Sequence, residues 1–326
     1  MIYPQFLKKG DTIGICAPSA GVGRDLDEYL ESIKVLKKQG YKIKETKSVR
    51  TNSKRSASAV QRAKEFYDLT SDKNVDMIMF ATGGDYMLEI MPFVEYDQLV
   101  KNPKWIMGMS DPTNILFDVT CGYDIATLYG FNGKNYNLKN EKCQNDNLQI
   151  IQGNLIKQKS YDKYQSTKDR WNGIDEYNND VKWISKKPID VKGRIIGGCF
   201  DVILNHLGTF LDNTKTFVVR YAQNGIIWYF DIYSKTPLDV YLGLLQLKYA
   251  GLFNKCKCVL IGRVAIENIE DKNFDYHKAV DKALGNIPHI MEMDIGHTHP
   301  CMTIINGAIA HVKCKNGKGE ISFELK

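Results

Sequence analysis

The sequence lacks the features that identify several classes of protein. No run of 18 apolar residues is present, so nothing predicts a membrane-spanning helix. Lysine and arginine outnumber the acidic residues 44 to 38 but form no long basic run, which argues against nucleic-acid binding. The first residues contain no apolar segment of the kind that directs export. We therefore expect a cytoplasmic protein that binds neither membranes nor nucleic acids.

The motifs of metal and nucleotide sites are also missing. The eight cysteines are dispersed, and Cys256 and Cys258 are too close together for the usual zinc-binding pair. Gly21-Val22-Gly23 lacks the third glycine of a dinucleotide-binding loop, and no Walker A sequence occurs. We expect no cofactor and no metal, and we interpret the cysteines as buried, reduced thiols.

The chain does contain a regular alternation of strand-like and helix-like segments. In the first 132 residues, apolar runs predict strands at 12–17, 41–43, 75–81 and 105–107. Amphipathic periods predict helices at 25–38 and 57–69, a helix that ends at Phe93, and a helix at 113–119. Such alternation is typical of βαβ units, in which helices cover a parallel sheet.

The same pattern returns after a polar stretch. Residues 136–190 are rich in Asn, Lys, Gln and Tyr, and we interpret them as a connector with one short helix at 147–157. Beyond the connector, the sequence predicts helices at 200–207 and 240–250 and strands at 225–231 and 258–262. The expected fold is α/β: an N-terminal parallel-sheet, flavodoxin-like domain at 1–135 and a smaller C-terminal α/β domain at 191–326, with the active site between them.

The most informative segment is Gly108-Met109-Ser110-Asp111-Pro112, which follows one predicted strand and precedes a predicted helix. We expect Asp111 to cap the helix and Pro112 to occupy its first position, where a missing N–H has no cost. Ser110 would then lie exposed on the turn beside the positive end of the helix dipole, as in a nucleophile elbow. The alternative is an ordinary helix cap, which the pentapeptide alone favours.

Three other segments supply candidate partners for Ser110. The backbone of Gly83-Gly84 could bind an anion, or could simply form a tight turn. His297 follows a glycine in a loop and is a candidate base, whereas metal binding with His299 lacks further ligands. Asp231 ends an apolar strand and could orient the imidazole, or could cap the next turn. Asp294 is a competitor for that role.

In the order Ser110, Asp231, His297, the chain resembles the LD-carboxypeptidase family of serine peptidases, which includes the microcin C immunity proteins. The matching stretches follow the family order: Gly10–Gly14 with Ala17–Ser19, Gly83–Asp85, Asn102–Thr113, Tyr129–Gly130, Gly193–Gly198, Leu207–Thr209, Gln246–Leu247 with Gly251, and Gly296–His297. The resemblance implies a Ser–Glu–His triad carried by two domains, in a homodimer that uses no metal.

Carried over residue by residue, the resemblance makes Ser110 the nucleophile and His297 the base. Asp231 falls at the acid, where the family usually has Glu, so the carboxylate here is one methylene shorter. The backbone amides of Gly84 and Asp111 map onto the oxyanion hole. An arginine that often follows the acid is absent from residues 238–241.

The leading hypothesis is a peptidase that removes the terminal D-residue from a murein tetrapeptide through an acyl-enzyme. A second hypothesis is an immunity-type amidase that cleaves an aminoacyl-nucleotide toxin. Trp171 in the connector could stack on the nucleobase, although a large aromatic more often anchors a segment to the body of the protein. A third hypothesis, a non-catalytic binder, is favoured by the Asp at position 231.

Overall fold

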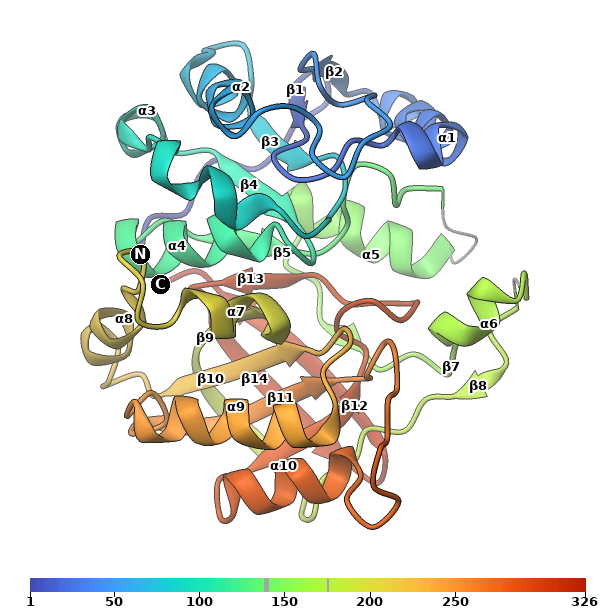
Figure 1. Ribbon diagram of the computed structural model, residues 1–326, viewed down its shortest axis with the longest axis vertical. Coiled ribbons are helices and arrows are strands. Elements are labelled where there is room, and N and C mark those ends of the chain that lie inside the picture. The colour runs from blue at the N-terminus through green and yellow to red at the C-terminus, as the bar shows by residue number, and fades with distance from the viewer. Residues whose placement is uncertain (138–140, 175) are drawn as a thin grey trace. The chain divides into compact units, whose positions relative to one another are not determined.

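The computed structural model describes residues 1–137, 141–174 and 176–326 (Figure 1). The chain forms two compact units. Unit 1 contains Met1–Asn154 and Thr303–Asn306, and unit 2 contains Leu155–Met302 and Gly307–Lys326. Unit 2 is therefore not the smaller one, because residues 155–190 belong to it. The domain boundaries at 135 and 190 stay a prediction of the sequence.

Unit 1 is built on a six-stranded sheet. Its strands, in spatial order, are β2 (Lys42–Glu45), β1 (Thr12–Cys16), β3 (Met77–Phe80), β4 (Trp105–Gly108), β5 (Thr127–Tyr129) and β13 (Ile304–Asn306). The first five are parallel, and β13 joins the edge antiparallel to β5. The order 2-1-3-4-5 is that of the flavodoxin-like fold, as the sequence predicts. β3 and β4 are buried throughout, as parallel strands covered on both faces are.

Helices separate the strands of unit 1. They are α1 (Leu26–Lys38), α2 (Ala59–Ser71), α3 (Asp97–Lys101), α4 (Thr113–Tyr123) and α5 (Glu141–Ile151), with 3₁₀ helices η1 (Gly23–Asp25) and η2 (Met87–Phe93). The side chain of Ser58 caps α2 by accepting a hydrogen bond from Gln61 N. α2 packs on β1, and α4 packs on β4 and β5.

Two helix predictions in unit 1 need correction. The segment that ends at Phe93 is a 3₁₀ helix, and Pro92 within it has no N–H for a helical hydrogen bond. The connector helix predicted at 147–157 is α5, which ends earlier, at Ile151, and belongs to unit 1.

Unit 2 contains a mixed seven-stranded sheet. Its strands, in spatial order, are β12 (His289–Met293), β11 (Cys256–Gly262), β10 (Ile226–Asp231), β9 (Ile189–Cys199), β14 (Ile309–Lys315), β15 (Lys318–Glu324) and β6 (Gln158–Lys159). The first four are parallel and the last three are added antiparallel. A separate two-stranded ladder pairs β7 (Lys163–Tyr164) with β8 (Asn179–Asp180).

The helices of unit 2 follow its strands along the chain. They are α6 (Thr167–Trp171), α7 (Phe200–His206), α8 (Thr214–Arg220), α9 (Pro237–Tyr249) and α10 (Tyr276–Leu284). α7 packs on β9, and α9 packs against α10. Thr236 and Asp239 form a capping box at the start of α9, with Pro237 at the first helical position. α9 therefore begins three residues before the helix predicted at 240–250.

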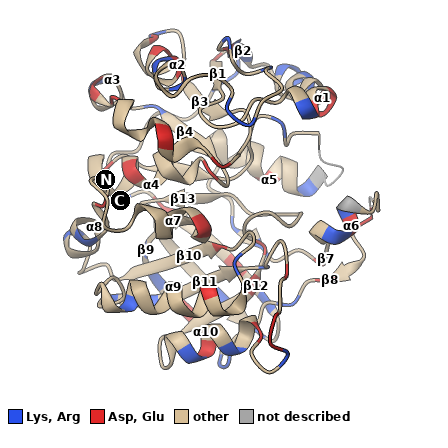
Figure 2. Cartoon of the chain, viewed as in Figure 1, with Lys and Arg blue, Asp and Glu red and all other residues tan. Residues whose placement is uncertain are grey.

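The charged residues of both signs are mixed along the helices (Figure 2), and the cysteines are reduced thiols. Lys and Arg lie among Asp and Glu on helices of each unit (Figure 2). No disulfide links the eight cysteines, all of which lie in described residues, and burial raises the pKa of the Cys16 and Cys199 thiols. No helix within the described ranges is both long and apolar enough to cross a bilayer.

Candidate active site

Ser110 lies on a strained turn at the carboxyl end of β4. The strand ends at Gly108, α4 begins at Thr113, and Thr113 N donates a 2.9 Å hydrogen bond to Ser110 O. Ser110 has a φ of +75°, which a residue with a Cβ rarely adopts, and its N–H donates to Tyr129 Oη at 3.2 Å. Such strain is found at functional turns that project a side chain out of the sheet. The side chain is half-buried.

The Gly83–Gly84 backbone lies directly against Ser110. A Cβ added to Gly83 would be 2.9 Å from Ser110 Cβ and 3.2 Å from its Oγ. Gly84 has a φ of +146°, and a Cβ there would overlap the hydroxyl of Ser19. A side chain at either position would clash with these neighbours. The close contacts therefore require glycine at 83 and 84, in addition to any requirement of the turn. β1, β3 and β4 are neighbours in the sheet, which is why the loops after them meet.

Asp111 does not cap the helix as the sequence predicted. The N-cap of α4 is Pro112, and no side chain makes the capping hydrogen bond. The buried carboxylate of Asp111 instead accepts hydrogen bonds from the Ser19 hydroxyl, from Met87 N at 2.8 Å and from Asn114 Nδ2 at 2.9 Å. Burial raises the pKa of the Asp111 carboxyl to about 6, although the Ser19 hydrogen bond acts in the opposite direction.

His297 and Asp231 meet within unit 2. Asp231 ends β10 with no exposed surface, and its Oδ2 lies 2.8 Å from His297 Nδ1. Its Oδ1 accepts a 3.3 Å hydrogen bond from His297 N. His297 Nδ1 is at ion-pair distance from Oδ2, without the alignment of a hydrogen bond. Gly296, at a φ of +98°, lies so close to Asp231 that a Cβ would overlap the carboxylate. The Tyr233 ring lies 4.6 Å from the imidazole, centroid to centroid.

Asp294 has a structural role in the same loop. Its Oδ1 pairs with Arg263 Nη2 at 2.7 Å, and its Oδ2 accepts from Trp183 Nε1 at 2.8 Å and from Tyr161 N at 3.2 Å. Arg263 is itself buried and also donates to Thr298 Oγ1 at 3.1 Å. The loop between β12 and β13 is thus anchored on both sides of His297, and Asp294 does not compete for the imidazole.

Two further residues considered from the sequence are Trp171 and His299. Trp171 is the last residue of α6, and its side chain lies outside the described part of the structure. His299 belongs to no group of His, Cys, Asp and Glu side chains that could hold a metal ion among the described residues. Sequence inspection missed Ser19 and Arg263. Both follow buried strands, at the carboxyl ends of β1 and β11, and Ser19 also lies in a stretch that matches the family, although neither signal assigns it a role.

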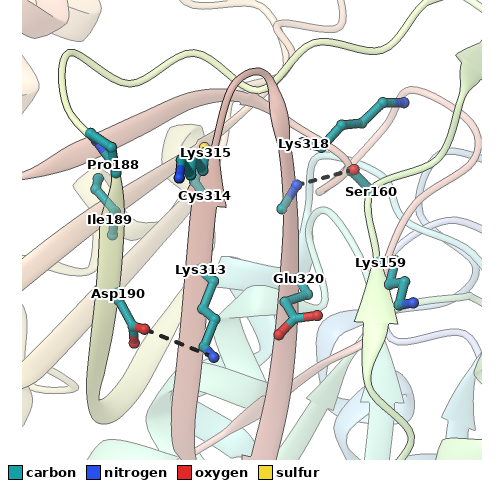
Figure 3. Close-up of a pocket in the computed structure, with 11 residues that line it drawn as sticks. Lys159, Ser160, Pro188, Ile189, Asp190, Lys313, Cys314, Lys315, Lys318 and Glu320 are labelled. Carbon is teal, nitrogen blue, oxygen red and sulfur yellow. Dashed lines mark hydrogen bonds and ion pairs between the residues drawn. The ribbon is translucent and has the colours of Figure 1, made fainter.

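A hollow of about 660 Å³ lies elsewhere in unit 2 (Figure 3). Across the adjacent strands that line it, register neighbours alternate in charge: Asp190, Lys313, Glu320 and Lys159. This row is a cross-strand arrangement that stabilises a solvated sheet surface. Asp231 pairs with Cys199 at the opposite end of β9, so the hollow is separate from the His297 cluster.

Comparisons with known proteins match almost the whole chain. The model of the LD-carboxypeptidase N-terminal domain matches residues 13–130, and that of the C-terminal domain matches residues 192–312. The microcin C7 self-immunity protein MccF of Escherichia coli is 24% identical over 91% of this chain and 89% of its own length. A probable murein peptide carboxypeptidase of Bacillus subtilis is 21% identical over 94% of this chain and 90% of its own.

Solved structures share the fold. The structure of MccF in complex with aspartyl sulfamoyl adenosine superposes with a TM-score of 0.85 at 22% identity, covering 100% of both chains. The muramoyltetrapeptide carboxypeptidase from Oxalobacter formigenes superposes with a TM-score of 0.76 at 19% identity, covering 96% of this chain and 98% of its own.

Proposed function

Because the chain belongs to the LD-carboxypeptidase family and is thus a serine-type carboxypeptidase, we propose that Ser110, His297 and Asp231 form its catalytic triad. The observation that carries the proposal is the 2.8 Å approach of Asp231 Oδ2 to His297 Nδ1. An aspartate therefore reaches the imidazole here, although the carboxylate is one methylene shorter than that of Glu. Asp231 is buried, and such a carboxylate holds the imidazole in one tautomer.

The proposed reaction proceeds through an acyl-enzyme. His297 Nε2 accepts the Ser110 hydroxyl proton as Oγ bonds to the amide carbonyl carbon. The oxyanion that forms is stabilised by the backbone N–H groups of Gly84 and Asp111. When the C–N bond breaks, the proton on His297 passes to the departing amine. Water then repeats the sequence with His297 as base, and releases the acid and free Ser110.

The proposed substrate is a murein tetrapeptide from which the enzyme removes the terminal D-residue. The family membership and the relative named as a probable murein peptide carboxypeptidase support this choice. Incubation of the protein with a purified tetrapeptide should release D-Ala, detected by mass spectrometry, and Ser110→Ala should abolish the release. Equal release by wild type and Ser110→Ala would refute the mechanism. Absence of release by the folded wild type would refute the substrate.

A second candidate substrate is an aminoacyl-nucleotide toxin. The similarity to MccF, whose structure holds aspartyl sulfamoyl adenosine, favours this candidate. Trp171 is the residue that we propose to stack on the nucleobase. Cells that express the wild type should then survive the toxin, and Trp171→Ala should lose this protection while its murein peptide cleavage is kept. Failure of the wild type to protect would exclude this candidate.

We further propose that the protein acts in the cytoplasm as a homodimer, as the family resemblance implies. Light scattering after size-exclusion chromatography should give twice the mass of the 326-residue chain. The alternative of a non-catalytic binder predicts that a fluorophosphonate probe leaves Ser110 of the folded wild type unlabelled, whereas the proposed enzyme is labelled there.

A further inference from the structure

We propose that the carboxylate of Asp111 is a positioning group, which holds the Gly83–Gly84 loop against the turn that carries Ser110. This inference rests on the proposed role of Ser110 as nucleophile. It assigns the Asp111 side chain a role separate from that of its backbone amide. The amide would contact the oxyanion, whereas the side chain would act through the loops that it joins.

The carboxylate of Asp111 joins three elements that follow strand ends. Oδ2 accepts hydrogen bonds from the Ser19 hydroxyl, after β1, and from Met87 N, after β3. Oδ1 accepts from Asn114 Nδ2 in the first turn of α4 at 2.9 Å. The Ser19 hydroxyl in turn accepts from Tyr86 N at 3.2 Å, so the loop after β3 is bound to Asp111 directly and through Ser19.

These hydrogen bonds enclose the Gly83–Gly84 segment on two sides. On one side, Gly83 contacts the Ser110 side chain. On the other, Gly84 contacts the Ser19 hydroxyl, and Ala20 N donates a 3.3 Å hydrogen bond to Gly83 O. Asp111 follows Ser110 directly and binds Ser19, so its carboxylate fixes the spacing between the two sides. An oxyanion hole needs such fixed donors, because movable ones would reorient during the reaction.

A second buried group, on α2, holds the same two loops. Arg62 of α2 donates from Nη1 to Pro18 O at 2.8 Å and to Tyr86 O at 2.9 Å. Arg62 is almost fully buried and pairs with Glu89 at 2.9 Å. Loss of the Asp111 carboxylate should therefore loosen the glycine pair without releasing the loops from the body of unit 1. This makes a substitution at position 111 a usable test.

The test compares four variants: Asp111→Ala, Asp111→Asn, Ser19→Ala and the matched control Asp118→Asn. Asp118 is also buried, and burial likewise raises the pKa of its carboxyl to about 6, but it lies within α4, seven positions after Asp111 in the sequence. The first readout is the second-order rate constant for labelling of Ser110 by a fluorophosphonate. The second is the pair of steady-state constants, kcat and KM, for the murein tetrapeptide. Thermal unfolding checks that each variant is folded.

Loss of one oxyanion donor lowers kcat by about 10²–10³-fold. A displaced Gly83–Gly84 loop keeps its donors but misplaces them, so we expect a decrease near the lower end of that range. We expect Asp111→Ala to lower kcat and the labelling rate about 100-fold with little change in KM. Asp111→Asn keeps an acceptor for Met87 N and should restore part of the rate. The kcat and labelling rate of Ser19→Ala should lie between those of the wild type and Asp111→Ala. Asp118→Asn should match the wild type in both rates.

Two results would overturn the inference while leaving the proposed function in place. One is a folded Asp111→Ala variant with wild-type kcat and labelling rate. The other is an equal loss of rate in Asp118→Asn, which would mean that loss of any buried carboxylate in this region has the same effect. If the wild type is neither labelled at Ser110 nor active on the tetrapeptide, the proposed function fails first.

Discussion

Replacement of Asp231 by Glu should impair this enzyme, although Glu is the residue that the family resemblance implies at this position. The carboxylate has no exposed surface and is contacted from two sides by the His297 loop. Gly296 lies so close that even a Cβ would overlap Oδ1. A further methylene moves the carboxylate by about 1.5 Å, the length of a C–C bond, toward groups already in contact.

The His297 loop cannot easily retreat by that distance. Its anchor is the buried pair of Arg263 and Asp294, joined at 2.7 Å and supported by Trp183. Insertion of a methylene into such a packed site costs about 1–3 kcal/mol. A displacement of about 1 Å at a catalytic group can lower the rate about 100-fold. We therefore expect Asp231→Glu to lower both the free energy of unfolding, by about 1–3 kcal/mol, and kcat/KM, by about 100-fold.

Asp231→Asn is the matched control because it keeps the volume of the side chain and removes the charge. It should leave packing nearly unchanged yet lower kcat by about 10⁴-fold, since the imidazole loses the group that fixes its tautomer. Urea unfolding measures the first effect, and release of D-Ala from the tetrapeptide measures the second. The reasoning is refuted if Asp231→Glu is as stable and as active as the wild type, or if Asp231→Asn keeps wild-type kcat.

Three other substitutions test the supporting structure. Gly84→Ala should destabilise the protein by about 1–3 kcal/mol and slow fluorophosphonate labelling, because alanine disfavours its φ of +146° and overlaps Ser19; unchanged unfolding and labelling would contradict this. Arg263→Met should lower the free energy of unfolding by about 3–5 kcal/mol in urea, since it leaves Asp294 charged and buried; a loss below about 1 kcal/mol would argue against this pairing. Burial raises the pKa of the Asp118 carboxyl from 3.8 to about 6, so the folded state binds the proton more tightly and this group stabilises the protein below pH 4 relative to pH 7. The unfolding free energy of the wild type minus that of Asp118→Asn should therefore fall by about 2 kcal/mol between pH 4 and pH 7, and a flat difference would exclude the shift.

The sequence predicted the elements whose signal is local. β1, β3, β4, β10 and β11 are apolar runs buried on both faces, and each appears close to its predicted place. The hairpin of β14 and β15 was missed because one of its faces is open to solvent, so lysines interrupt its apolar residues. β13 has only three residues and is placed by its pairing with β5, some 175 positions away in the sequence, and nothing local indicates that contact.

The candidate site shows the same division between local and distant signals. Ser110 and His297 could be found because their residue types and their flanking glycines or prolines suggest positioned loops. Asp111 was misassigned as a cap because its partner Ser19 is 92 residues away and nothing near position 111 predicts that bond. The residues around Asp231 leave a turn cap open as an alternative; the family resemblance places Asp231 at the acid, and its 2.8 Å contact with His297 supports that role.

In each unit, a candidate reactive side chain lies at the end of a parallel strand or in the loop after one, and a glycine backbone lies close against a side chain of the site. Gly83 contacts Ser110 in one unit, and Gly296 contacts Asp231, the partner of His297, in the other. A buried carboxylate then fixes each loop: Asp111 holds the loops around Ser110 through hydrogen bonds to neutral donors, whereas Asp294 pairs with a buried arginine. The two carboxylates should therefore respond differently to neutral replacement. Asparagine at 111 can still accept a hydrogen bond from a backbone N–H, but asparagine at 294 leaves the Arg263 charge buried and uncompensated, so it should destabilise the protein far more.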